Sequence, residues 1–333
     1  MLSAQAAVSD LRAALYRDAS GAQDAVVGCF AKGATVRLAF PFETLSGGAG
    51  FWGAALAPLL AAWPDLERRD HIAITGTDGE GAVWVGCCGH YLGTFVAPFL
   101  GIPPTGRPVS MRYHEFFRVE DGKIVEMQAL WDIPEVMMQA GVWPMNPSLG
   151  REWLVPGPAT QDGLGPHDPV HSQASLGHVI DMLTHLSKHP AQGGPELMEL
   201  DRFWHPKFNW YGPAGIGSTR GVSGFRRDHQ IPFLAAMPDR GQRRGELRAH
   251  FFAEGNYVGV TGWPNMKQTI SAGGWLGIAP SGQLIEMRSL DFWRLENGLI
   301  RENWVLVDLL SVYDQIGVDV FARMKEIRPW TIA

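Results

Sequence analysis

The chain has 333 residues, of which 46% are hydrophobic and 19% are charged, and its formal net charge is -6. This length suits two domains of ordinary size, each large enough to bury its own core. Acidic and basic residues are interspersed without long runs, so the sequence predicts neither a nucleic acid nor an anionic membrane surface as a partner. It contains neither a long apolar stretch nor a basic start followed by an apolar core, which favours a cytoplasmic protein without a membrane span.

The first part of the chain predicts helices followed by strands. A helix is expected over residues 8–31, and a helix-loop region ends at Pro64-Asp65. Strands over residues 110–119 and 124–131 flank Asp121-Gly122, a pair typical of a hairpin turn. A short helix over 134–139 is expected to stop at Gly141. Residues 143–175 contain several prolines and glycines, which indicates a linker.

After this linker the chain repeats itself. At an offset of 176 residues, segments 111–142 and 287–318 agree at 14 of 32 positions without a gap. An offset of 174 aligns Leu60-Ala-Ala62-Pro64-Asp65 with Leu234-Ala-Ala236-Pro238-Asp239. Helices are expected over 176–189, 196–204 and 310–315, and Asn297-Gly298 marks the second hairpin. A period this long indicates two copies of a whole domain, 1–142 and 176–333, each of the α+β class.

The three cysteines carry no sign of a metal site or a disulfide. Cys29 stands alone, and Cys87 and Cys88 are adjacent, a spacing at which a disulfide rarely forms. We expect all three to be small buried apolar residues in a reducing compartment.

Two aspartates occupy equivalent positions, Asp132 and Asp308, at the end of the last predicted strand of each copy. Burial raises the pKa of a carboxyl group, so either aspartate can be a general base at neutral pH. A helix begins two residues later and aspartate is a favoured N-cap residue, so helix capping is the alternative role. The spacing leaves both roles open.

The preceding strand carries a second set of candidates. Copy one has Arg112, His114 and Glu115, and copy two keeps the arginine and the acid as Arg288 and Asp291 but replaces the histidine by leucine. The arginines either hold an anionic group of a substrate or pair with a neighbouring carboxylate. All five residues are predicted to contact substrate.

Copy two also has a dense set of aromatic and histidine side chains, typical either of a cavity for a flat ligand or of an aromatic core. His229 lies in a polar patch and is a candidate proton-transfer partner for Asp308. The predicted substrate-binding members of this set are Trp210, Tyr211, His250, Trp263 and Trp304.

Several familiar site motifs are missing from the sequence. It has no Gly-x-Ser-x-Gly elbow, no phosphate-binding glycine loop, no dinucleotide fingerprint and no His-Glu-x-x-His. We therefore expect acid-base chemistry by side chains alone, with no metal and no cofactor.

The motifs of both copies resemble one family. Two motifs in each copy resemble those of the SnoaL-like polyketide cyclases and ester cyclases. In copy one they are Leu100-Gly-Ile-Pro-Pro-Thr-Gly-Arg107 and Phe117-Arg-Val-Glu-Asp-Gly-Lys-Ile124. In copy two they are Leu276-Gly-Ile-Ala-Pro-Ser-Gly282 and Phe292-Trp-Arg-Leu-Glu-Asn-Gly298. The resemblance covers about residues 8–142 and 176–324.

This resemblance implies two tandem cone-shaped α+β barrels of the nuclear transport factor 2-like type, each a bent antiparallel sheet packed on about three helices. It also implies that Asp132 and Asp308 line a ligand cavity, and that the copies pack as an internal pseudo-dimer, with a homodimer of the chain as a further option. The implied function is acid-base catalysis on a carbonyl-containing, partly apolar small molecule, by aldol-type cyclisation, isomerisation or lyase chemistry. A small-molecule-binding protein without catalysis, or a hydrolase in which the aspartate activates water, are the alternatives. Met127 and Gln128 replace the aromatic residue usual for the family, so copy one is expected to be the more structural half.

Overall fold

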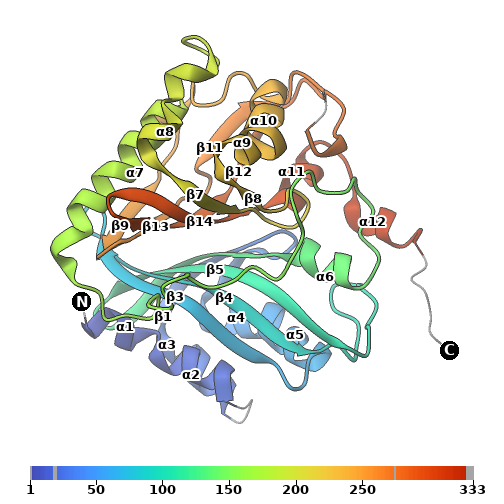
Figure 1. Cartoon of the computed structure of the whole chain (residues 1–333). Helices are drawn as coiled ribbons and strands as arrows, with labels where there is room; N and C mark the ends of the chain where they lie inside the picture. Colours follow the sequence, from blue (N-terminus) through green and yellow to red (C-terminus); the bar gives the residue numbers. More distant parts are fainter. Residues whose placement is uncertain (1, 18–20, 274, 328–333) are drawn as a thin grey trace. The chain divides into compact units, whose positions relative to one another are not determined.

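A computed structural model describes residues 2–17, 21–273 and 275–327 (Figure 1). The chain forms two compact units. Unit one comprises Met1–Pro144, Ala159–Leu164 and Asp319–Ala333, and unit two comprises Met145–Pro158 and Gly165–Val318. The segment predicted as a linker thus contributes pieces to both units, and the residues after Val318 group with unit one although they follow copy two in the sequence.

The N-terminal helices of unit one are shorter than predicted. The single helix expected over residues 8–31 is wrong in part: α2 (Ser9–Arg17) and α3 (Ala22–Cys29) are separate helices, and α1 (Leu2–Ala7) precedes them. Residues 18–20 of that prediction lie outside the described residues. Gly21, at the start of α3, has a φ of 72°, a left-handed conformation that glycine adopts without a Cβ clash. At Phe30 the backbone becomes extended and begins a strand.

Unit one contains a six-stranded sheet in the order β2-β1-β6-β5-β4-β3. The predicted hairpin between the last two strands is confirmed, with Asp121 and Gly122 both at positive φ. Neighbouring strands are antiparallel except β1 and β6, which are parallel, a pairing that the sequence did not predict. The strands are β1 (Phe30–Leu38), β2 (Glu43–Ser46), β3 (Glu67–Thr77), β4 (Val83–Thr94), β5 (Pro108–Glu120) and β6 (Lys123–Trp131).

Unit one has further helices between β2 and β3, after β6 and over residues 320–324. α4 (Gly47–Phe51), a π-helical turn (Trp52–Leu56) and α5 (Ala57–Ala62) form one continuous segment that lies with α1–α3 on one face of the sheet (Figure 1). The short helix predicted after the last strand is α6 (Ile133–Gln139), and α12 (Val320–Met324) also belongs to this unit.

Unit two repeats the arrangement with the order β8-β7-β14-β13-β10-β9, and here the parallel pair is β7 with β14. The second predicted hairpin is confirmed at Asn297 and Gly298. A two-stranded sheet of β11 and β12 is added. The strands are β7 (Trp204–Tyr211), β8 (Thr219–Arg220), β9 (His250–Glu254), β10 (Tyr257–Thr261), β11 (Met266–Thr269), β12 (Leu284–Met287), β13 (Ser289–Glu296) and β14 (Leu299–Val307).

Helices α7, α8, α9 and α10 of unit two lie on one face of its six-stranded sheet (Figure 1). The main helix α7 begins a little earlier than predicted. A π-helical turn at Arg226–Gln230 occupies the position of the π-helical turn in unit one, at the 174-residue offset. The helices are α7 (Ser172–Leu186), α8 (Leu200–Phe203), α9 (Gly221–Phe225), α10 (Ile231–Ala236) and α11 (Leu309–Gln315).

The predicted α+β class and the tandem arrangement are confirmed. Within the described residues neither six-stranded sheet closes on itself, since β2 and β3 are the edges of the first and β8 and β9 are the edges of the second. Each unit is therefore an open, mostly antiparallel sheet with helices on one face rather than a closed barrel.

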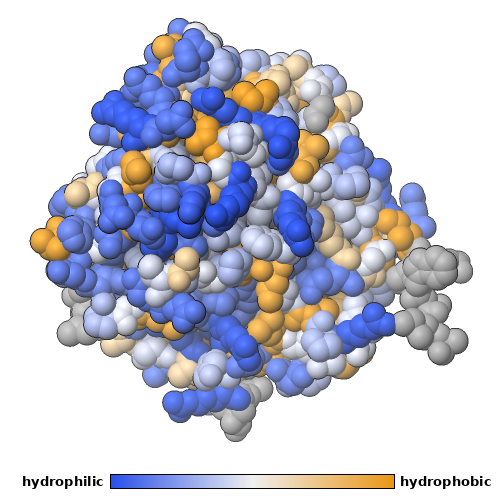
Figure 2. Space-filling model, in the orientation of Figure 1, coloured by the Kyte–Doolittle hydropathy of each residue, from blue (hydrophilic) through white to orange (hydrophobic). Residues whose placement is uncertain are grey.

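The visible surface is mostly hydrophilic (Figure 2), and the three cysteines are buried. Figure 2 shows hydrophilic side chains over much of the visible face, with apolar side chains in separate groups. In the described part of the chain, every helix is too short or too polar to cross a lipid bilayer. Cys29, Cys87 and Cys88 are free and buried, as predicted.

Candidate functional site

Two neighbouring cavities lie inside unit two. The outer cavity has a volume of about 300 Å³ and is bounded by α7, β9, β10, β11, β13 and the segment after α10. The inner cavity, of about 100 Å³, lies against β7, α10, β13 and β14. Six residues line both cavities, which places the cavities side by side: Leu183, Arg240, Met266, Ser289, Asp291 and Trp293.

Asp291 is the carboxylate at the boundary between the cavities. Alternation along β13 directs Ser289, Asp291 and Trp293 to the same face of the sheet, and all three line both cavities. Ser289 Oγ donates a hydrogen bond of 2.6 Å to Asp291 Oδ1. Burial raises the pKa of Asp291 to about 7, although the Ser289 hydrogen bond and the charge of Arg240 oppose the rise. Near neutral pH this group therefore takes up or releases a proton readily.

His229 lies in the inner cavity, within the π-helical turn that precedes α10. Its ring stacks on Trp210 with a centroid distance of 4.1 Å and an angle of 15° between the planes. Burial, together with the charge of Arg240, lowers its pKa to about 3, so the imidazole is neutral at physiological pH. His229 therefore offers a hydrogen bond rather than a charge.

Several polar atoms that border the inner cavity have no hydrogen-bond partner. Such atoms are rare in folded proteins, because leaving a buried donor or acceptor unpaired costs about 1–3 kcal/mol. A ligand in the cavity would satisfy them. Among the described residues they are His229 Nδ1, Gln230 Oε1, Trp204 Nε1, Trp275 Nε1 and Trp293 Nε1.

The two predicted aspartates lie elsewhere. Asp308 caps α11, where its carboxylate accepts a hydrogen bond of 3.2 Å from the Ser311 backbone and pairs with Arg288 at 3.1 Å. Asp132 lies at the start of α6 and pairs with Arg112 at 3.6 Å. Neither aspartate is among the residues that line the two cavities. The structure thus brings His229 together with Asp291 and not with Asp308.

The predicted aromatic residues divide into two groups. Trp210 lines the inner cavity. Tyr211 instead donates a hydrogen bond of 3.1 Å to Glu302, and Trp304 Nε1 donates to the backbone oxygen of Pro156 at 2.9 Å. The other two lie outside both cavity linings: Trp263, whose ring lies 4.6 Å from the Arg288 guanidinium carbon, and His250 at the start of β9.

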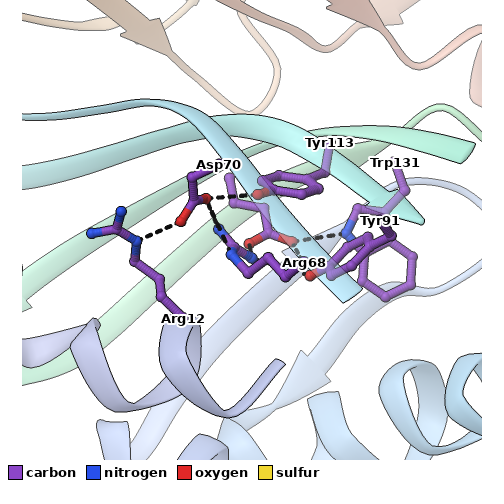
Figure 3. Close-up of polar contacts among 7 residues, drawn as sticks. Arg12, Arg68, Asp70, Tyr91, Tyr113 and Trp131 are labelled. Atoms are coloured by element: carbon purple, nitrogen blue, oxygen red, sulfur yellow. Dashed lines mark hydrogen bonds and ion pairs between the residues drawn. The ribbon is translucent and has the colours of Figure 1, made fainter. Parts of the chain in front are cut away.

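In unit one, the acid equivalent to Asp291 is enclosed by partners (Figure 3). Glu115 is fully buried and accepts hydrogen bonds from Arg68 at 2.6 Å, Tyr91 at 2.9 Å and Trp131 at 3.0 Å. The same arginine pairs with Asp70 at 2.9 Å, and Asp70 also accepts from Arg12 and Tyr113, both at 2.6 Å. His114 is buried on the opposite side of β5. With three donors around it and no exposed surface, the Glu115 carboxylate is inaccessible to a substrate.

The sequence pattern did not single out Ser289, Trp293 and Arg240 as site residues. Ser289 and Trp293 follow from Asp291 by strand alternation, a signal that was available in the sequence. Arg240 comes directly after the repeated Pro-Asp stop, but its position beside the cavity depends on the tertiary fold. Among the described residues, no three His, Cys, Asp or Glu side chains are grouped as metal ligands.

Comparisons with known proteins agree with this architecture. A family model described as SnoaL-like polyketide cyclase matches residues 16–140 and 194–316, one match in each copy. Similar solved structures include AclR from Streptomyces galilaeus, which is 21% identical, with 42% of this chain and 97% of that chain covered and a TM-score of 0.34. IdmH from Streptomyces antibioticus is 25% identical, with 40% of this chain and 96% of that chain covered and a TM-score of 0.33. A SnoaL-like protein from Jannaschia sp. CCS1 is 23% identical, with 41% of this chain and 90% of that chain covered and a TM-score of 0.36. No curated protein matches the chain. With the family motif present in both copies, the chain belongs to the SnoaL-like polyketide cyclase family.

Proposed function

We propose that copy two is an acid-base enzyme in which Asp291 removes a proton from a carbon next to a carbonyl group. The substrate is a partly apolar small molecule, and the product of the proton transfer leads to aldol-type cyclisation, isomerisation or elimination. Family membership supports a cyclase-type reaction, and IdmH is itself described as a candidate polyketide cyclase.

The observation that carries this proposal is the environment of Asp291. A general base is most effective when its pKa lies near the working pH, and burial raises the pKa of Asp291 to about 7. The carboxylate borders both cavities and is held by a single short hydrogen bond from Ser289. Removal of the substrate proton protonates Asp291 and moves the C–H electron pair towards the carbonyl oxygen.

The negative charge that develops on that oxygen needs hydrogen-bond donors. Trp293 Nε1 and Trp275 Nε1 are buried, border the inner cavity and have no other partner. Neutral His229 adds a third group able to donate. Donors fixed in place before the reaction stabilise developing charge without reorganisation, and the loss of one such donor typically slows a reaction about 100- to 1,000-fold.

The test measures proton abstraction itself. Wild-type protein is incubated in deuterium oxide with aryl 1,3-dicarbonyl compounds, and exchange of the acidic C–H is followed by NMR. We expect Asp291→Asn to slow the protein-dependent exchange by roughly 100- to 10,000-fold, because an amide cannot accept the proton. Asp314→Asn, a change at an exposed aspartate of α11, serves as the matched control.

Asp308→Asn separates this proposal from the one based on sequence alone. If Asp308 is the base, as the strand-end position first indicated, its replacement abolishes exchange and Asp291→Asn leaves it intact; that result would contradict our proposal. We expect the reverse. The proton-exchange rate of Asp308→Asn, corrected for the fraction of folded protein, should lie within about threefold of the wild-type rate. This corresponds to a change of less than about 1 kcal/mol in the activation free energy. Binding of the compounds without exchange would instead favour the non-catalytic binding role.

A further inference from the structure

We infer that the substrate of this site carries an oxyanion, such as a carboxylate, next to its apolar ring system, and that Arg240 selects for this charge. The inference rests on the proposed function, because it names the class of substrate for the same cavities.

The first observation is the division of the outer cavity wall by chemistry. One part is apolar and comes from α7, β9, β10 and β13, with Leu183, Phe251, Val260 and Trp293. The other part carries Arg240, Arg243 and Lys267, against the single carboxylate Asp291. A neutral ring would use only the apolar residues of this wall, whereas a ring with an attached oxyanion can contact the cationic ones as well.

The second observation concerns the carboxylates that accompany these cations. Asp239 pairs with Arg243 at 2.7 Å but is also held by the Thr269 backbone, and it does not line the cavity. Lys267 pairs with Glu246 and Glu286, both about half exposed and both outside the lining. The positive members of these pairs border the cavity and their negative partners do not, so a ligand in the cavity meets the cations first.

The third observation is the position of Arg240 itself. It lines both cavities, and its guanidinium carbon lies 5.8 Å from the ring centroid of Phe233. Its charge acts on Asp291 and on His229, which come from different elements of the fold. Arg240 is thus the cation common to the binding space and to the proposed catalytic group. A guanidinium that lines a cavity is well suited to bind a carboxylate through charge-assisted hydrogen bonds.

Comparison with copy one supports a specific role for this residue. The 174-residue offset aligns Arg240 with Leu66, immediately after the shared Pro-Asp pair. The same offset aligns His229 and Gln230 with Ala55 and Leu56. Copy one thus has no arginine at the position aligned with Arg240, and the cation beside its equivalent acid is instead the buried Arg68, which pairs with Glu115.

Two probes of equal shape test the inference: 2-naphthoate and 2-naphthamide, which differ in charge. Binding to the full-length protein is measured by calorimetry at pH 7. We expect the carboxylate to bind about tenfold more tightly than the amide, and the preference to fall in 0.5 M salt because screening weakens charge interactions. Arg240→Gln should reduce the preference to less than about threefold, whereas Arg240→Lys keeps the charge and should retain most of it.

The controls distinguish the inference from the proposed function. Arg202→Gln alters an exposed arginine of α8 outside both cavities and should leave the preference unchanged. Asp291→Asn should bind 2-naphthoate at least as tightly as wild type while it loses proton exchange. Equal affinity for the two probes, or an unchanged preference in Arg240→Gln, overturns the inference and leaves Asp291-dependent exchange standing. Failure of both probes to bind overturns the inference as well, and exchange that does not depend on Asp291 refutes the proposed function alone.

Discussion

The same strand position carries an acid in both copies, but the two acids have opposite surroundings. Glu115 is fully buried and accepts hydrogen bonds from Arg68, Tyr91 and Trp131, the three donors labelled in Figure 3. Asp291 accepts a hydrogen bond from Ser289 and borders two cavities. An acidic residue at the same position in both copies therefore does not imply the same catalytic role. The neighbouring side chains of each copy determine whether the acid can contact a substrate.

The largest stability effect is expected from Glu115→Gln. The change leaves the fully buried guanidinium of Arg68 with one carboxylate partner fewer, and removing one member of a buried ion pair typically costs about 3–5 kcal/mol. Chemical denaturation, followed by tryptophan fluorescence, measures the loss in free energy of unfolding. The control is Glu120→Gln at the exposed end of the same strand. A loss below about 1 kcal/mol for Glu115→Gln would mean that the network in Figure 3 contributes little to stability.

Asp291→Asn is expected to change stability in the opposite direction. The folded-state pKa of Asp291 is raised from 3.8 to about 7, so its protonated form is favoured on folding. The contribution is fully present below about pH 4 and is lost as the pH rises through 7. Above pH 7 the variant should therefore be more stable than wild type, by up to about 4 kcal/mol, and the difference should vanish near pH 4. Denaturation curves at pH 4, 6 and 8 test this, and equal stability at all three would refute it.

A smaller effect is expected where the aspartate caps a helix. Asp308→Asn keeps a side chain able to cap α11 but weakens the pair with Arg288, so we expect a loss of about 1–2 kcal/mol. Asp132→Asn should cost less, because Asp132 makes no capping hydrogen bond and its pair with Arg112 is longer, at 3.6 Å. Thermal unfolding of both variants gives the comparison. An equal loss in the two would show that the shorter ion pair of Asp308 contributes no more to stability than the longer pair of Asp132.

The smallest effect is expected from a change at Ser289, which alters the pKa of Asp291 but leaves the carboxyl group in place. The hydrogen bond from Ser289 Oγ lowers the pKa of Asp291, so Ser289→Ala should raise that pKa and shift the pH dependence of proton exchange to higher pH. Ser289→Thr retains the hydroxyl group and is expected to preserve the wild-type profile. Identical profiles for all three proteins would show that this hydrogen bond does not set the protonation of the base.

Much of the fold was predictable from the sequence, because it is recorded in local patterns. Asp121-Gly122 and Asn297-Gly298 fix the two hairpins, and Gly141 and Gly317 follow the short terminal helices, as the pattern predicts. The parallel pairings of β1 with β6 and of β7 with β14 were not predictable, because they join segments far apart in the chain.

The candidate site was only partly predictable. Retention of an acid at Glu115 and Asp291, and the polar patch around His229, were visible in the sequence. Linear order could not tell which acid is saturated, since Arg68 is 47 residues away from Glu115 in the chain and meets it only through sheet packing. It also favoured Asp308, whose strand-end position suits a base and a helix cap equally well.

The most direct test of this account is a titration of the Asp291 carboxyl carbon by 13C NMR, with Asp291→Asn used to assign the signal. The account predicts a midpoint near pH 7, as expected for a buried carboxyl group poised to exchange protons. A midpoint near the ordinary value of 3.8 would contradict it, since Asp291 would then be ionised throughout the neutral range and would be a poor base.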